Sequence, residues 1–201
     1  GERTSFGIGA ESTGVLHPVK RWDSLTITRL PIGHAVSVTP MQVHCAMGTV
    51  ANDGVLMKPQ IVRRIYQNDE ESMVVFKPIS RRRALSRNSC ALLTDALTDV
   101  VSAKGTAQRA AVTGFQVAGK TGTTRKLVDG RYSNQKHVAS FSGFLPAENP
   151  RVVITVVVDE PRFNGIGYGG VVAAPSFRKI AEGVVAYLGI QPEETVPNDR
   201  P

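Results

Sequence analysis

The sequence predicts an α/β fold of the α+β type, in which an antiparallel sheet packs with helices. Three strand-like runs lie close together, at about residues 115–125, 137–145 and 151–159. The last two are separated only by the turn-forming residues 146–150, and connections this short indicate antiparallel pairing. Helical periodicity before and after these runs supplies the other layers of the fold.

The length of 201 residues and the net charge of +7 set the broad class. One domain with a buried core is expected at residues 1–190, and a proline- and acid-rich tail at 191–201 should be disordered. No basic helix is interleaved with aromatic residues, so we expect no nucleic-acid binding. The chain starts with Gly1 and has no run of 18 apolar residues. We therefore expect a fragment of a longer protein, with any membrane anchor upstream.

The first part of the chain is expected to hold loops and one helix. Residues 1–38 are rich in glycine, proline and threonine and should form loops with short strand or helix pieces. Thr39 followed by Pro40 predicts a helix start, because a hydroxyl caps free N–H groups and proline fits the first turn. Apolar residues at helical spacing continue toward Gly54, which we expect to end the helix as the C′ glycine.

The middle of the chain is expected to form a strand pair and a second helix. Residues 60–66 and 73–76 are predicted to pair as strands through a polar turn. The second helix should run from Ser86 to about Ala103, with its apolar positions on one side, and should be ended by Gly105.

A loop and a closing helix should complete the sheet. The polar residues 126–136 are expected to form a loop that is long enough to be mobile and to border the cleft. A helix at 175–188 should lie across the sheet. Cys45 and Cys90 are expected to be buried free thiols. Neither these cysteines nor the four histidines have metal-ligand spacing, so we expect no metal and no cofactor.

The most distinctive stretch is 117–125, where small and hydroxylated residues surround one lysine. Its β-branched threonines favour an extended backbone. Alternation would then place Lys120 and Gly122 on one face and Thr121 and Thr123 on the other. A strand that offers a cation, two hydroxyls and open amide N–H groups suits a substrate with a carboxylate and a reacting carbonyl.

Two catalytic or binding motifs fit this stretch. Residues 120–122 match the K-T-G element of penicillin-recognising serine enzymes. Residues 114–121 also match the phosphate-binding pattern G-x-x-x-x-G-K-[ST] of P-loop proteins. A P-loop needs a helix that opens at its lysine, whereas the residues after Lys120 are poor helix formers. We therefore favour the K-T-G interpretation, with a P-loop nucleotide-binding module or an ordinary strand lysine as alternatives.

Further segments carry a resemblance that spans the chain to about residue 190. In order, they are Gly7, Gly9, Glu11, Gly14, Trp22, Ile32-Gly33, Thr39-Pro40-Met41-Gln42, Ala51-Asn52-Asp53-Gly54, Lys58-Pro59, Gly105-Thr106-Ala107, residues 118–123, Ser140-Phe141-Ser142-Gly143-Phe144, Asp159-Glu160-Pro161, Tyr168-Gly169-Gly170 and Ala174-Pro175. Together they resemble the C-terminal part of the transpeptidase domain of class B penicillin-binding proteins, closest to the division-type enzymes. The chain departs from the family at Ala35, where a second glycine is usual.

The resemblance implies a penicillin-binding/β-lactamase-like transpeptidase fold and covalent acyl transfer. In the family a serine attacks the D-Ala-D-Ala carbonyl of a peptidoglycan stem peptide, and an amine of a second stem peptide resolves the acyl-enzyme. The nucleophile lies in S-x-x-K and a second element is S-x-N. Residues 176–179 and 86–88 match these patterns by letters, but in the wrong order along the chain. We therefore expect the nucleophile upstream, and this chain alone to be inactive.

The resemblance also assigns roles to the K-T-G strand. Lys120 would supply positive potential at the site, and the hydroxyls of Thr121 and Thr123 would hydrogen-bond the substrate carboxylate. The backbone N–H of Thr123 would be one oxyanion donor. Gly122 would let the acyl chain lie against the strand, and Arg125 would be a second carboxylate contact.

The implied partners are peptidoglycan stem peptides ending in D-Ala-D-Ala, β-lactam antibiotics, and proteins of the division or elongation complex. The implied location is the periplasmic or extracytoplasmic face of the bacterial inner membrane, with the anchor upstream. A relative that hydrolyses or senses β-lactams is the main alternative. The G-T-A element at 105–107 and the T-P-x-Q element at 39–42 favour a transpeptidase.

Overall fold

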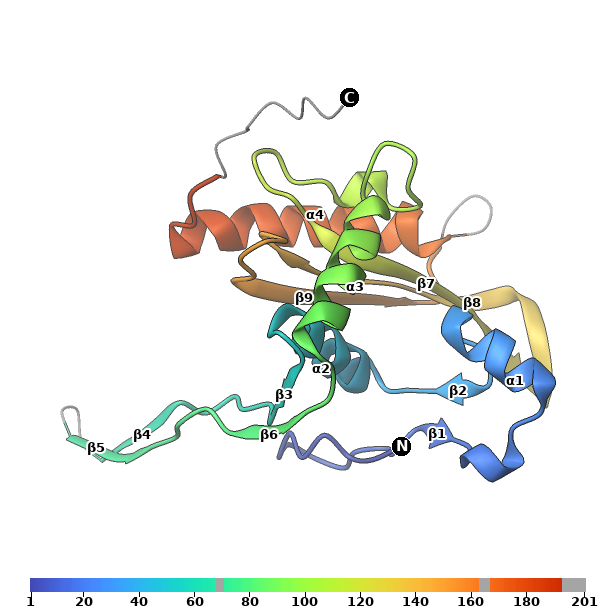
Figure 1. The fold of residues 1–201 in the computed structure, drawn as a ribbon, viewed down its shortest axis with the longest axis horizontal. Helices are drawn as coiled ribbons and strands as arrows, with labels where there is room; N and C mark the ends of the chain where they lie inside the picture. The colour runs from blue at the N-terminus through green and yellow to red at the C-terminus, as the bar shows by residue number, and fades with distance from the viewer. Residues whose placement is uncertain (68–70, 163–166, 193–201) are drawn as a thin grey trace.

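The computed structural model describes residues 1–67, 71–162 and 167–192. Its centre is a three-stranded antiparallel sheet in the order β7-β8-β9, with helices on both faces (Figure 1). The predicted fold class is therefore confirmed. The strands are β7 (Ala118–Val128), β8 (Arg131–Leu145) and β9 (Val152–Asp159). The covering helices are α4 (Gly169–Leu188) on one face and α2 (Pro40–Ala51) and α3 (Arg87–Asp99) on the other.

The hairpin between β7 and β8 is longer than the sequence pattern predicts. Asp129 and Gly130 both have positive φ, at 50° and 76°, and form a two-residue turn between Val128 and Arg131. An Asp-Gly pair suits this turn, because its backbone twist matches that of the flanking strands. The loop predicted at 126–136 is therefore wrong, since most of these residues pair as strand.

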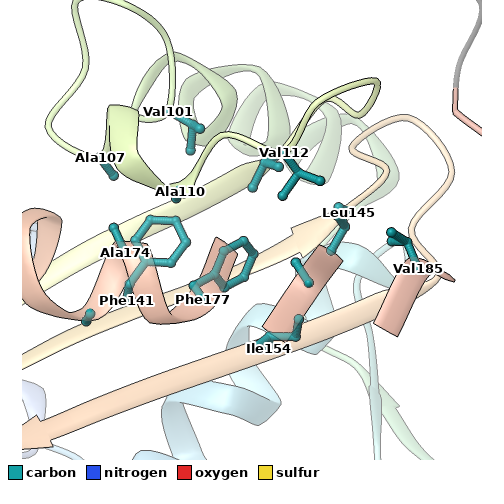
Figure 2. Close-up of a cluster of buried hydrophobic side chains, with 13 residues drawn as sticks. Val101, Ala107, Ala110, Val112, Phe141, Leu145, Ile154, Ala174, Phe177 and Val185 are labelled. Carbon is teal, nitrogen blue, oxygen red and sulfur yellow. The ribbon is translucent and has the colours of Figure 1, made fainter. Parts of the chain in front are cut away.

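The face under α4 holds the larger apolar core (Figure 2). Phe141 of β8 and Phe177 of α4 are fully buried and meet edge to face, with ring centroids 4.7 Å apart. Helix α4 begins at Gly169 rather than at the predicted Pro175, which lies inside the helix. Proline removes one helical hydrogen bond. The buried contacts of Ala173, Ala174 and Phe177 on both sides of the proline hold the helix together at this point.

The opposite face is covered by α2 and α3. Thr39 and Gln42 form the capping box that starts α2, as the Thr-Pro signal predicts. At the other end, Asp53 takes the left-handed conformation and the Gly54 N–H bonds the Thr49 carbonyl at 2.8 Å. The C′ residue is therefore Asp53, not Gly54 as predicted. Gly54 is needed because a side chain there would meet the Leu85 carbonyl.

Helix α3 starts where predicted and ends earlier. The Ser86 hydroxyl accepts from the Ser89 N–H at 3.0 Å and caps the first turn. The helix ends at Asp99, four residues before the predicted end at Ala103, and turns lead on to Gly105. Gly105 occupies a tight corner, where a side chain would meet the carbonyls of Asp99 and Val100.

The remaining elements are short. Residues 1–38 form loops with small strand and helix pieces, as predicted. The strand pair expected at 60–66 and 73–76 is present as an antiparallel hairpin that projects away from the body (Figure 1). These elements are β1 (Val15–Leu16), η1 (Val19–Arg21), α1 (Ser24–Arg29), η2 (Leu30–Ile32), β2 (Val36–Ser37), β3 (Val55–Met57), β4 (Arg64–Gln67), β5 (Glu71–Val75), β6 (Ser80–Arg83) and η3 (Gln108–Ala110).

The structure also bears on the expectations for the cysteines, the C-terminal tail and a membrane span. Cys90 is buried and Cys45 only partly so, and both are free thiols. The tail expected to be disordered lies outside the described residues from 193 onward. Within the described part of the chain, no helix combines the length and the apolar character needed to cross a bilayer.

Candidate active site

The K-T-G residues lie on β7 at the end of the central sheet. Among the described residues, β7 pairs only with β8, so its other edge is open. Lys120 is paired with Ser142 and Thr121 with Phe141. Because paired residues share a face, Lys120 and Gly122 lie on the α2 face, and Thr121 and Thr123 lie on the α4 face. The predicted alternation is therefore confirmed.

This strand also decides against the P-loop alternative. A P-loop places a helix N-terminus at its lysine. Here Lys120 is the third residue of an 11-residue strand, and residues 120–128 continue in extended conformation. The match to the phosphate-binding pattern is therefore one of letters only.

The two threonines are held by residues far away in sequence. The Gly169 N–H, at the start of α4, donates to Thr123 Oγ1 at 3.1 Å. The hydroxyl oxygens of Thr121 and Thr106 lie 3.3 Å apart. A threonine hydroxyl has one hydrogen to donate and two lone pairs. Since Thr123 accepts from Gly169, its own hydrogen remains available to donate to a carboxylate.

A cavity of about 470 Å³ opens beside these hydroxyls. Thr106, Thr121 and Thr123 line it together with the first residues of α4 and Arg109. The N-terminus of a helix carries partial positive charge and exposed N–H groups, so it favours an anion. Hydroxyl donors, a helix N-terminus and an arginine make this cavity suitable for a carboxylate.

Glycine is required where the start of α4 meets β7 and the G-T-A segment. A side chain at Gly169 would meet the carbonyl oxygens of Ser140 and Gly122, and one at Gly170 would meet the Thr106 carbonyl. A Cβ at Gly122 would lie 2.5 Å from Ser140 Oγ. The α4 terminus therefore lies close against the G-T-A segment and against β7, to which it is hydrogen-bonded. Sequence reasoning assigned no role to Gly169 and Gly170; their only signal was the Tyr-Gly-Gly match.

The two cations of the strand that the sequence assigned to the site differ in their surroundings. Lys120 is exposed, and its Nζ donates to the Thr121 carbonyl at 3.0 Å. Arg125 donates from Nη1 to Asn134 Oδ1 at 3.1 Å, which ties it to the neighbouring strand of the hairpin. The structure therefore places Lys120, Thr121, Gly122 and Thr123 together at the open edge and leaves Arg125 at the base of the hairpin.

Acidic residues at the end of β9 have a structural partner. Lys126 Nζ lies 3.0 Å from Asp159 and 2.8 Å from Glu160. The hydrogen bond from Lys126 holds the pKa of Glu160 below its ordinary value, and the same bond raises the pKa of Lys126. These groups join the ends of β7 and β9 across the sheet, in agreement with a strand-end role.

The serines that match catalytic patterns by letters have structural partners. Ser86 caps α3. Ser176 lies inside α4, and its hydroxyl donates to the Val172 carbonyl at 3.4 Å. A nucleophilic serine needs a base within hydrogen-bond reach, and the bonds of Ser86 and Ser176 are those of helix structure instead.

Comparison with known proteins decides the family. The chain matches the family described as penicillin binding protein transpeptidase domain over residues 1–182. The chain belongs to this family. It is 35% identical to a probable peptidoglycan D,D-transpeptidase PenA of Neisseria flavescens, over 98% of this chain and 46% of the relative. The resemblance to class B, division-type penicillin-binding proteins is thereby confirmed.

Solved penicillin-binding protein structures share the fold. The transpeptidase domain of penicillin-binding protein 3 from Burkholderia pseudomallei superposes with a TM-score of 0.80 at 34% identity, over 95% of this chain and 55% of that one. Penicillin-binding protein 3 of Mycobacterium tuberculosis, solved with ampicillin, gives a TM-score of 0.83 at 31% identity, over 100% of this chain and 45% of that one. This chain thus spans about half the length of these proteins.

Proposed function

We propose that this chain supplies the substrate-holding strand of a peptidoglycan D,D-transpeptidase that acts through a serine acyl-enzyme and binds β-lactams. The observation that carries the proposal is the hydrogen bond from Gly169 to Thr123 at the open edge of the K-T-G strand. It orients a hydroxyl donor beside a helix N-terminus, on the strand that also carries the cation Lys120. Family membership and the relatives named as transpeptidases support the same reaction.

In this proposal the strand holds the acyl donor for attack. The carboxylate of a D-Ala-D-Ala peptide, or of a β-lactam, receives hydrogen bonds from the hydroxyls of Thr121 and Thr123 and lies in the positive potential of Lys120. Gly122 leaves space for the peptide against the strand, the Thr123 N–H stabilises the oxyanion, and Arg125 provides a second carboxylate contact from the hairpin.

The nucleophilic serine comes from a segment outside these 201 residues. Its oxygen bonds to the carbonyl carbon, and terminal D-Ala leaves as an amine that takes up a proton. An amine of a second stem peptide then displaces the serine and forms the cross-link. The partners are stem peptides, β-lactams and proteins of the division or elongation complex, and the site faces the extracytoplasmic side of the membrane.

The test is covalent labelling with fluorescent penicillin of the protein in which this chain is joined to its nucleophile-bearing segment. Lys120→Ala should slow labelling by about 100-fold, because it removes the cation of the site. Lys126→Ala is the matched control, since that lysine pairs with Asp159 and Glu160 at the far end of the strand. Equal labelling rates for the parent and Lys120→Ala would overturn the proposal.

The same experiment separates a transpeptidase from a β-lactam-hydrolysing relative. A transpeptidase should keep the penicilloyl label, because its acyl-enzyme is resolved by an amine rather than by water. Rapid loss of label with turnover of penicillin would identify a hydrolase instead.

A further inference from the structure

A row of side chains crosses the α2 face of the sheet, in line with Lys120. Thr155 of β9 is paired with Ser142 of β8, and Ser142 is paired with Lys120 of β7. Directly paired residues project to the same face, with their Cβ atoms about 5 Å apart. The three side chains therefore stand side by side across the three strands, and His44 of α2 meets the end of the row away from Lys120.

Hydrogen bonds join the members of this polar row. Ser142 Oγ and Thr155 Oγ1 are 2.7 Å apart, and His44 Nδ1 lies 3.1 Å from Thr155 Oγ1. Ser142 is only 3% exposed, and His44 and Thr155 are partly buried. Burying such groups is unfavourable unless they are bonded. Nearby on the same face, Ala118, Phe144 and Val153 pack with Met47 in an apolar cluster.

The chemistry of the groups gives the polar row a direction. Burial lowers the pKa of His44 and favours the neutral ring, in which one nitrogen accepts and the other donates. We assign Nδ1 as the accepting nitrogen in this row, so that Thr155 donates to Nδ1 and Ser142 donates to Thr155. This assigns the ring proton to Nε2. Both hydroxyl dipoles turn their oxygen ends toward β7, so the Ser142 lone pairs face the lysine side of the row.

We propose that His44, Thr155 and Ser142 are positioning residues for Lys120. They hold an acceptor oxygen beside the lysine stem and so favour the conformations that keep its ammonium group at the substrate edge. Hydrogen bonds in such a chain polarise one another in the protein interior. Loss of the His44 ring therefore changes the polarity of the Ser142 hydroxyl at the other end of the row. The inference rests on the proposed function, in which Lys120 acts on the bound carboxylate.

The test measures the rate of penicillin acylation in the protein that includes the nucleophile. His44→Phe removes the acceptor and keeps a ring of similar size, and Ser142→Ala cuts the row beside Lys120. Each should slow acylation about fivefold, the equivalent of one neutral hydrogen bond of about 1 kcal/mol. The double variant should acylate at the rate of Ser142→Ala alone, because His44 acts only through the row.

A rescue and a control separate positioning from structural damage. His44→Asn places an amide oxygen near the position of Nδ1 and should acylate at nearly the parent rate. Thr98→Val is the control, since that hydroxyl donates to the Thr94 carbonyl within α3, and should leave the rate unchanged. If Ser142→Ala fails to fold, the acylation rates of His44→Phe and His44→Asn still test whether His44 acts as a positioning residue.

Three results would overturn the inference while leaving the proposed function in place. They are single-variant rates within twofold of the parent, losses that multiply in the double variant, and equal rates for His44→Asn and His44→Phe. A parent protein that takes up no penicillin overturns the proposed function, and this inference with it.

Discussion

Replacing Thr121 and Thr123 together by valine should disable carboxylate recognition while the fold survives. Valine has nearly the shape of threonine and lacks the hydroxyl. Thr123 is exposed, and its oxygen accepts one bond from the Gly169 N–H at 3.1 Å. Losing that acceptor should lower the free energy of unfolding by about 1 kcal/mol, which a folded domain tolerates.

The effect on catalysis should be larger, because the lost bonds go to a charged group. A hydrogen bond to a carboxylate contributes about 1.5–3 kcal/mol, or about 10- to 150-fold in rate when it is made in the transition state. The two hydroxyls share one carboxylate, so their contributions are not additive. We expect acylation by the double variant to be slower by about 100- to 1000-fold.

The assay is stopped-flow or gel-based acylation with fluorescent penicillin, with unfolding followed by urea titration. Thr123→Ser keeps the hydroxyl and should acylate at nearly the parent rate. Thr98→Val removes a remote hydroxyl and should acylate normally. A double valine variant that folds and still acylates at the parent rate would remove both threonines from the site.

Three further predictions follow from packing, burial and the open strand edge. Phe177→Ala empties a fully buried position against Phe141 and should cost about 3–5 kcal/mol of unfolding free energy by urea titration; a loss below 1 kcal/mol would contradict the core assignment. Burial lowers the pKa of His44 from its ordinary value of 6.5, so protonation of this ring favours the unfolded chain. The free energy of unfolding should therefore be highest above pH 6.5 and should fall as the pH drops through the folded-state pKa. His44→Phe should flatten that part of the pH profile of thermal unfolding, and an unchanged slope would contradict it. Residues 1–201 expressed alone should take up no penicillin and should self-associate on size exclusion through the open edge of β7; a labelled or monodisperse chain would contradict this.

Local signals in the sequence determine several features of this protein. The Thr39-Pro40 start of α2 depends on a cap, whose groups lie within four residues of one another. The alternation of Lys120 and Thr121 between faces depends only on the period of an extended chain. The Asp129-Gly130 pair is an equally local hairpin signal. The loop predicted at 126–136 is wrong because it rests on polar composition and not on this turn signal. The ordered series of family segments also sufficed to identify the transpeptidase family.

Tertiary structure decided what brings the site together. The bond between Gly169 and Thr123 joins residues 46 positions apart in the sequence. In the polar row, His44 and Thr155 are 111 positions apart. No local pattern encodes such pairs, because they depend on the register of three strands and on which helix covers each face. Long-range packing also explains why α4 begins before Pro175. Buried contacts on both sides of this proline outweigh the one helical hydrogen bond that it removes. Chain periodicity therefore determined the faces of the strand, and long-range burial determined which groups meet on them.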